Sequence, residues 1–272
     1  MLGTLFCWAC LEVDALARRR TPRIELINKW TARWARAMLR VFGIRIAARG
    51  PYVSSGRVYP GRDEQGVGRI FVMNHRAAVD IPVILSLAAA HAISRHDLAH
   101  WPLIGAGARR IGTLFVDRTS RRSGAMVLKQ IEQVLAAGEG IAMFPEGTAF
   151  DGDEVRQFKP GAFKAARRAG AEIIPLGIAY GDRAAYYSRQ PFLTHVKRLG
   201  MLARLNVAVE VGDPIRVGER APGEAEEACR RTVEQLVLQA RQRLGGEPHL
   251  LAASPPAVEP ADAHAGAAPR RP

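Results

Sequence analysis

The chain has 272 residues, of which 48% are hydrophobic, so it is long and apolar enough to bury the core of one large domain. Its 39 Lys and Arg residues outnumber 26 Asp and Glu residues, and the formal net charge of +13 favours an anionic partner. Three cysteines exclude a disulfide framework and are typical of a reducing cytoplasm.

The first eleven residues are apolar, and acidic residues follow at once at Glu12 and Asp14. A bilayer-spanning helix needs about 20 apolar residues, so this stretch is too short to span one. Its basic cluster, at 18–20, comes after the apolar run and not before it, which argues against a signal peptide and export. Cys7 and Cys10 form a CxxC pair without a second pair of ligands, so we expect no metal site.

Residues 24–42 are predicted to form an amphipathic basic helix. Apolar residues recur at spacings of three and four, and another face is basic, namely Lys29, Arg33, Arg36 and Arg40. Trp30 and Trp34, together with the basic face, favour a helix that lies in the headgroup layer of a membrane. The alternative is a helix that packs on the domain's own core with a solvated basic face.

The basic region, residues 18–49, contains ten Lys and Arg residues and one acid, Glu25. Nucleic acid and anionic lipid both fit this charge. The interleaved aromatic residues that favour single-stranded nucleic acid are absent outside Trp30 and Trp34, so we expect a membrane lipid surface and no nucleic acid as the partner.

The remaining chain alternates short apolar runs with helical patterns after a Gly/Ser/Pro-rich loop at 52–68. The predicted strands are 69–73, 112–116, 140–144, 173–179 and 206–211, and the predicted helices are 80–92, 123–137 and 222–244. This alternation predicts an α/β domain with a mainly parallel central sheet flanked by helices. We expect an N-terminal membrane-associating helical segment at 1–50, a domain at 51–246 and a disordered Ala/Pro-rich tail at 247–272.

The segment 74–80, Asn-His-Arg-Ala-Ala-Val-Asp, follows a predicted strand and begins a predicted helix, where α/β proteins present catalytic groups. Five helical residues would turn His75 and Asp80 about 140° apart, so the two can meet only if His75 lies in the turn and Asp80 in the first helical turn. Asp80 would then accept the Nδ1 proton and leave Nε2 free as a general base. The alternative is an ordinary helix cap beside a surface histidine.

No Gly-x-Ser-x-Gly nucleophile elbow accompanies this pair. Three further motifs follow in or at the end of predicted strands, namely Gly-Thr-Leu-Phe-Val-Asp-Arg at 112–118, Phe-Pro-Glu-Gly-Thr at 144–148 and Ile-Pro-Leu-Gly at 174–177. This order resembles the four-motif signature of the glycerolipid and lysophospholipid acyltransferase family, which includes bacterial 1-acylglycerol-3-phosphate acyltransferases. The resemblance covers roughly 72–177 and extends weakly to 212–215.

The resemblance implies a role for each matching residue. His75 would be the base and Asp80 its orienting partner, and the acceptor site would be formed by Arg118, Glu146, Gly147 and Thr148. Ala149 stands where the family commonly has Arg or Ser, so Lys159 or Arg156 would supply a missing cation, and Arg95 stands where relatives tend to have Lys. Without the family, Arg118 would be a loop arginine paired with Asp117, and 144–147 a turn after a strand.

The expected function is transfer of a fatty acyl group from an acyl thioester, on coenzyme A or acyl carrier protein, to the hydroxyl of a lysophospholipid. The expected acceptor is 1-acyl-sn-glycerol-3-phosphate, and no bound cofactor is implied. The expected place is the cytoplasmic face of the inner membrane. A lyso-aminolipid acceptor is an alternative, motivated by Ala149, and a non-catalytic basic membrane-binding module is another.

Overall fold

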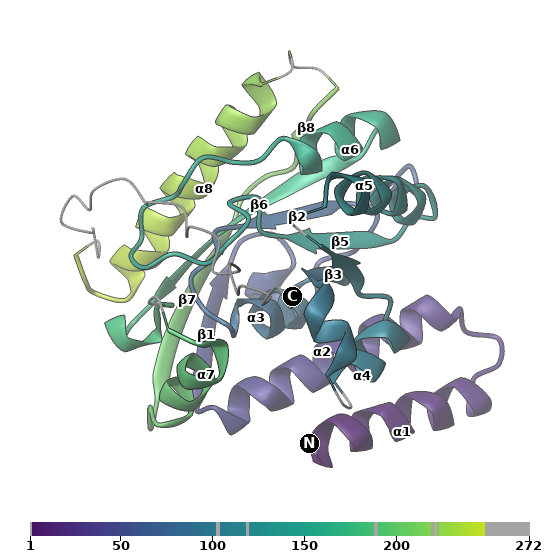
Figure 1. Ribbon diagram of the computed structural model, residues 1–272, viewed down its shortest axis with the longest axis horizontal. Coiled ribbons are helices and arrows are strands. Elements are labelled where there is room, and N and C mark those ends of the chain that lie inside the picture. The colour runs from purple at the N-terminus through teal and green to yellow at the C-terminus, as the bar shows by residue number, and fades with distance from the viewer. Residues whose placement is uncertain are drawn as a thin grey trace, which may run out of the picture.

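A computed structural model describes residues 2–101, 104–117, 120–187, 190–218, 221 and 223–247. In these residues eight strands form one mixed sheet with helices on both faces (Figure 1). The strands are β1 (Ile44–Arg49), β2 (Ile70–Met73), β3 (Ala90–Arg95), β4 (Leu114–Val116), β5 (Gly140–Met143), β6 (Glu172–Tyr180), β7 (Leu205–Val211) and β8 (Ile215–Arg216). The α-helices are α1 (Leu2–Ala17), α2 (Arg23–Val41), α3 (Asp80–Leu87), α4 (Ile104–Arg110), α5 (Arg121–Ala136), α6 (Gly161–Ala169), α7 (Phe192–Gly200) and α8 (Glu224–Arg243).

The strand order is β1-β7-β6-β2-β5-β3-β4, and β8 pairs with β6. Five neighbouring pairs are parallel, while β6 pairs antiparallel with β7 and with β8. The sequence prediction of a mainly parallel sheet is therefore confirmed. Strand β1 lies within the segment 1–50 and pairs with β7, so the sheet begins before residue 51.

Strand β2 divides the hydrophobic core into two layers. Its four side chains are all fully buried, and they alternate between the two faces of the sheet. Phe71 and Met73 belong to the cluster that α2 and α3 cover, whereas Ile70 and Val72 belong to the cluster that α5, α6 and α8 cover. A strand that is buried on both faces reads as a continuous apolar run, which explains why this segment was recognisable from sequence.

One predicted element is wrong in its extent. The helix expected at 80–92 ends at Leu87, where Ala88 takes an extended backbone, and strand β3 occupies Ala90–Arg95. Strand β3 pairs with β5 and β4. A continuous apolar run cannot separate a buried helix from the buried strand that follows it.

Helices α1 and α2 pack against each other, and α2 also packs against α3 (Figure 1). The indole of Trp30 donates to Asp14 Oδ2 at 3.0 Å, and the indole of Trp34 donates to Thr4 Oγ1 at 3.2 Å. Both indoles therefore hydrogen-bond to α1 while the two side chains stay partly exposed, and the placement of this helix in a headgroup layer stays a prediction. The residue spacing predicted helix α2 correctly, but it could not show that α1 packs against it.

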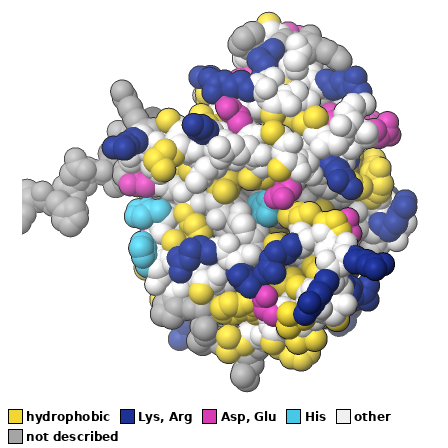
Figure 2. Space-filling model, turned by 90° about the vertical axis from the view of Figure 1, so that its right-hand side faces the viewer, with side chains coloured by type: hydrophobic (Ala, Val, Ile, Leu, Met, Phe, Trp, Pro, Cys, Tyr) yellow, Lys and Arg dark blue, Asp and Glu magenta, His cyan; other side chains and the backbone are white. Residues whose placement is uncertain are grey.

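Several apolar side chains of α1 are exposed. Leu5, Phe6, Val13 and Leu16 are 40 to 67% exposed. Figure 2 shows hydrophobic side chains at the lower edge of the molecule, where α1 lies, with Lys and Arg side chains beside them. No helix in the described part of the chain is long and apolar enough to cross a membrane. The Ala/Pro-rich tail lies outside the described residues from 248 onward.

Candidate active site

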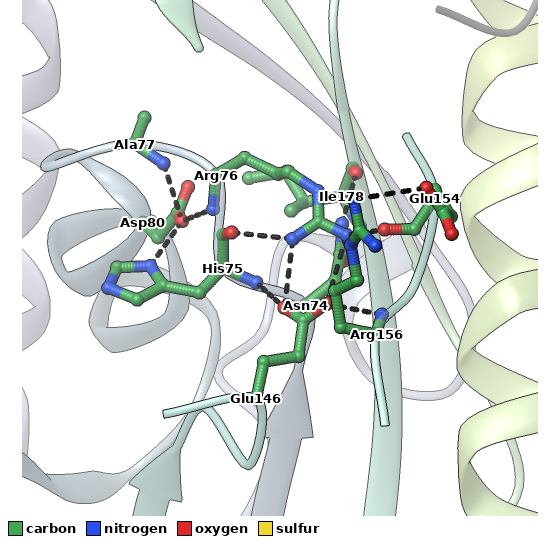
Figure 3. Close-up of polar contacts among 9 residues, drawn as sticks. All are labelled: Asn74, His75, Arg76, Ala77, Asp80, Glu146, Glu154, Arg156 and Ile178. Atoms are coloured by element: carbon green, nitrogen blue, oxygen red, sulfur yellow. Dashed lines mark hydrogen bonds and ion pairs between the residues drawn. The ribbon is translucent and has the colours of Figure 1, made fainter. Parts of the chain in front are cut away.

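The candidate site lies at the carboxyl ends of β2, β5 and β6, which share one edge of the sheet because these strands are parallel. The loop 74–79 connects β2 to α3 at this edge. The Asn74 side chain fixes the start of the loop, since its Nδ2 donates to the Ile178 carbonyl at 3.0 Å and its Oδ1 accepts from the Ile178 amide at 2.8 Å (Figure 3).

His75 and Asp80 meet as the spacing predicted. His75 Nδ1 lies 2.7 Å from Asp80 Oδ2, with Asp80 as the first residue of α3. The same carboxylate oxygen accepts the Arg76 amide at 2.5 Å and the Ala77 amide at 2.8 Å (Figure 3). Because Asp80 is fully buried and held by these donors, it fixes a proton on Nδ1 and leaves Nε2 as the acceptor.

The imidazole of His75 is held on its face as well as at its edge. The ring of Phe144 stacks on it, with centroids 4.2 Å apart and an interplanar angle of 18°. The His75 side chain is 16% exposed, and no described residue bonds to its Nε2. The ring is therefore oriented with one nitrogen free to take a proton from a hydroxyl group.

A buried ion pair connects the His75 loop to the Phe-Pro-Glu-Gly-Thr turn. Arg76 donates to both oxygens of Glu146, at 2.8 and 3.1 Å, and both side chains are fully buried (Figure 3). Glu146 also accepts the His75 amide at 2.7 Å and the Arg156 amide at 2.8 Å. Arg76 in turn donates to the Glu154 carbonyl at 2.5 Å. The carboxylate of Glu146 is thus occupied in holding the loops, and sequence reasoning overlooked its partner Arg76.

The other predicted acceptor residues are placed differently. Gly147 has φ +84°, and a side chain there would meet the Lys159 amine at 2.6 Å, so Lys159 lies beside this turn. Thr148 is exposed. Arg95 is 61% exposed at the end of β3, two strands from β2, and pairs with Asp97 at 2.9 Å. Arg118 lies outside the described residues.

Two buried groups that sequence reasoning missed also contact the His75 loop and Asp80. The hydroxyl of Tyr180, at the end of β6, donates to Asp80 Oδ1. His195 of α7 is fully buried, and its Nε2 accepts the Ala78 amide at 3.1 Å. Burial, with the neighbouring Arg198 cation, lowers the pKa of His195 to about 4, so it stays a neutral acceptor. Both lie more than a hundred residues from the loop, and no local pattern marks them.

Residues 60–179, which include the His75 loop and the Glu146 turn, match the family model described as Acyltransferase. This part of the chain matches the acyltransferase family. This acyltransferase therefore acts with an acyl donor and a lyso-lipid acceptor, and the family resemblance read from the four motifs is confirmed.

Several relatives are similar over most of their length. Lyso-ornithine lipid O-acyltransferases of Pseudomonas aeruginosa and Brucella abortus are 28% and 29% identical, over 78% and 79% of this chain and 78% and 84% of theirs. The 1-acyl-sn-glycerol-3-phosphate acyltransferase of Neisseria gonorrhoeae is 24% identical over 62% of this chain and 68% of its own.

A solved structure shares the fold of this acyltransferase. It is that of the 1-acyl-sn-glycerophosphate acyltransferase of Thermotoga maritima, with a TM-score of 0.62 and 20% identity over 90% of this chain and 96% of the other. The match supports the α/β fold with N-terminal helices, and at this identity it says nothing of the acceptor.

Proposed function

We propose that this acyltransferase moves a fatty acyl group from acyl-CoA or acyl carrier protein to the free hydroxyl of a lyso-aminolipid of the lyso-ornithine type. Two relatives that match over 78% and 84% of their own length carry that activity in their names. The glycerophosphate relative is less similar and matches over a smaller share. The motifs alone favour 1-acyl-sn-glycerol-3-phosphate over a lyso-aminolipid as the acceptor, whereas these relatives favour the lyso-aminolipid.

The observation that best supports an aminolipid acceptor is a buried carboxylate oxygen of Asp151, in the loop after Glu146, that lacks a hydrogen-bond donor in the described part of the chain. The preceding residue, Phe150, donates its amide to the His75 carbonyl at 3.0 Å, so Asp151 lies close to the His75 loop. Asp151 Oδ1 is buried, and no described residue donates a hydrogen bond to it. In contrast, the Asp153 carboxylate pairs with Arg241 at 2.8 Å.

A buried carboxylate oxygen without a donor is unfavourable by about 1 to 3 kcal/mol or more. The ammonium group of an aminolipid headgroup would supply the missing donor and neutralise the charge. Ala149 adds to this preference, because it removes the cation that a phosphate headgroup would need at the same turn. Asp151 would then recognise the amine of the acceptor.

In the mechanism we propose, His75 Nε2 accepts the proton of the acceptor hydroxyl while that oxygen attacks the thioester carbonyl carbon. The tetrahedral intermediate collapses with cleavage of the C–S bond, and the leaving thiolate takes the proton from the imidazolium. Asp80 stabilises the imidazolium and keeps the ring in place, because its Oδ2 is fixed by two backbone amides. The ester forms without a covalent enzyme intermediate.

The acceptor is a membrane lipid, and α1 is the element suited to reach it. Its exposed apolar residues, Phe6, Val13 and Leu16, would enter the headgroup boundary of the cytoplasmic face of the inner membrane. The basic residues 18–20 follow the end of α1 and would meet anionic lipid. The enzyme would therefore contact the membrane surface through α1 and residues 18–20.

Lysophosphatidate is the second candidate acceptor, and Lys159 favours it. The Lys159 amine lies beside Gly147 in the Phe-Pro-Glu-Gly-Thr turn, where a phosphate could be held. Arg118 would add a second cation there.

A comparison of acceptors with purified enzyme tests the proposal. We expect a higher kcat/KM for lyso-ornithine lipid than for lysophosphatidate. Asp151→Asn should lower kcat/KM for lyso-ornithine lipid about 10-fold or more, because a charge-assisted hydrogen bond contributes roughly 1.5 to 3 kcal/mol, and should spare lysophosphatidate. Glu154→Gln, an exposed acid of the same loop, is the matched control. Equal losses for both acceptors, or a wild-type preference for lysophosphatidate, would rule out the aminolipid assignment.

A further inference from the structure

The phenol of Tyr180 is directed at the carboxylate that holds His75. Its hydroxyl donates to Asp80 Oδ1, while His75 Nδ1 and two backbone amides all contact the other oxygen, Oδ2. Tyr180 is fully buried as the last residue of β6. Among the described residues, it is therefore the only donor to Oδ1.

Two further groups near this contact are the neutral His195 of α7 and Arg76 of the loop, whose charge Glu146 compensates. Tyr186 packs edge-on against Tyr180, with ring centroids 5.8 Å apart. Burial, reinforced by the Asp80 charge, raises the pKa of Tyr180 well above its usual range. The phenol thus remains a hydrogen-bond donor at every pH at which an enzyme of this kind works.

We propose that Tyr180 is a positioning residue that sets how tightly Asp80 holds the imidazolium of His75, an inference that rests on the proposed role of His75 as the base. A hydrogen bond from the phenol withdraws charge from the carboxylate. A less negative Asp80 attracts the Nδ1 proton less strongly. The imidazolium therefore returns its other proton to the leaving thiolate more readily, and we expect the acidic limb of the kcat/KM profile to lie at lower pH than it would without the phenol.

Tyr180→Phe removes only the hydroxyl and tests this directly. We expect the acidic limb of the kcat/KM profile to move to higher pH by about half a unit or more, which corresponds to about 0.7 kcal/mol at 1.36 kcal/mol per unit. The acceptor and donor are the same for every variant, so their own titrations cancel from the difference.

Tyr186→Phe is the matched control, because Tyr186 is a buried tyrosine of the same cluster whose hydroxyl donates to Asp153 instead of Asp80. This variant should lose stability, since the hydroxyl also accepts from Arg241 at 2.6 Å. Its acidic limb should stay where the wild type has it. A limb that moves equally in both variants, or in neither, would overturn the proposal.

A fluorinated tyrosine at position 180 gives a second test that keeps the side chain in place. Trifluorotyrosine has a more acidic phenol and donates a stronger hydrogen bond, so the limb should move to lower pH, opposite to Tyr180→Phe. An unchanged limb, or one that moves to higher pH, contradicts the proposal even if Tyr180→Phe fails to fold. A wild-type enzyme with no acidic limb, or a His75→Ala variant with full turnover, would instead show that the proposed base is wrong.

Discussion

Replacing Glu146 with Ala removes the carboxylate that neutralises the buried guanidinium of Arg76. Both side chains are fully buried, and the change also removes the acceptor of the His75 and Arg156 amides. Breaking a buried pair on one side costs about 3 to 5 kcal/mol of unfolding free energy, because a charge is left without its partner. At roughly 2 to 4 °C per kcal/mol for a chain of this size, the melting temperature should fall by about 6 to 20 °C.

The matched control is Glu132→Ala, which breaks the pair that Arg168 makes at 2.9 Å with its own side chain 65% exposed. An exposed pair contributes about 1 kcal/mol or less, so this variant should melt close to the wild type. Urea denaturation of the three proteins gives the free energies. If Glu146→Ala were as stable as Glu132→Ala and raised only the acceptor KM, Glu146 would contact the acceptor, and the account of it as a link between the two loops would be refuted.

Further predictions concern the membrane, the pH dependence of stability and the acceptor. Asp substitutions at Phe6 and Leu16 should weaken binding to anionic vesicles about tenfold or more, whereas Leu238→Asp on α8 should not; equal binding of all variants would exclude α1 as the membrane contact. The pKa of His195 is lowered from 6.5 to about 4, so the unfolded chain binds the extra proton and stability should fall by up to about 3 kcal/mol as pH drops through this window. His195→Gln should flatten that decline in urea midpoints. Arg118→Ala should raise the KM for lysophosphatidate, the acceptor with a phosphate, about tenfold or more and spare the donor KM; equal effects on both would make Arg118 structural.

The central part of the fold could be predicted because its segments are uniformly buried or strictly periodic. Strand β2 reads as a continuous apolar run, and helix α5 carries one apolar face behind the cap Ser120. Strand β1 escaped prediction because it is a short edge strand soon after the basic helix α2, and its alternation of apolar and basic residues breaks at Ala47 and Ala48. Its pairing with β7 connects segments about 160 residues apart, which no local pattern encodes.

One part of the candidate site could likewise be predicted from the sequence, and another part could not. The contact between His75 and Asp80 follows from a spacing of five residues and the start of α3. Tyr180 and His195 reach the same loop from β6 and α7, so only the folded chain brings them there. Arg76 lies within the motif, but its sequence does not show whether it is exposed or buried. Only the structure shows that it is fully buried and paired with Glu146.

The most direct test of the account is the rate at which purified His75→Ala transfers an acyl group from acyl-CoA to lyso-ornithine lipid. The His75 side chain is 16% exposed and stacks on Phe144, so the variant should lose some stability but stay folded, which its melting temperature checks. Loss of a general base typically costs about 10² to 10⁴ in rate, and the account predicts a loss of that size. A folded His75→Ala enzyme that retained a large share of wild-type turnover would contradict the assignment of His75 as the base.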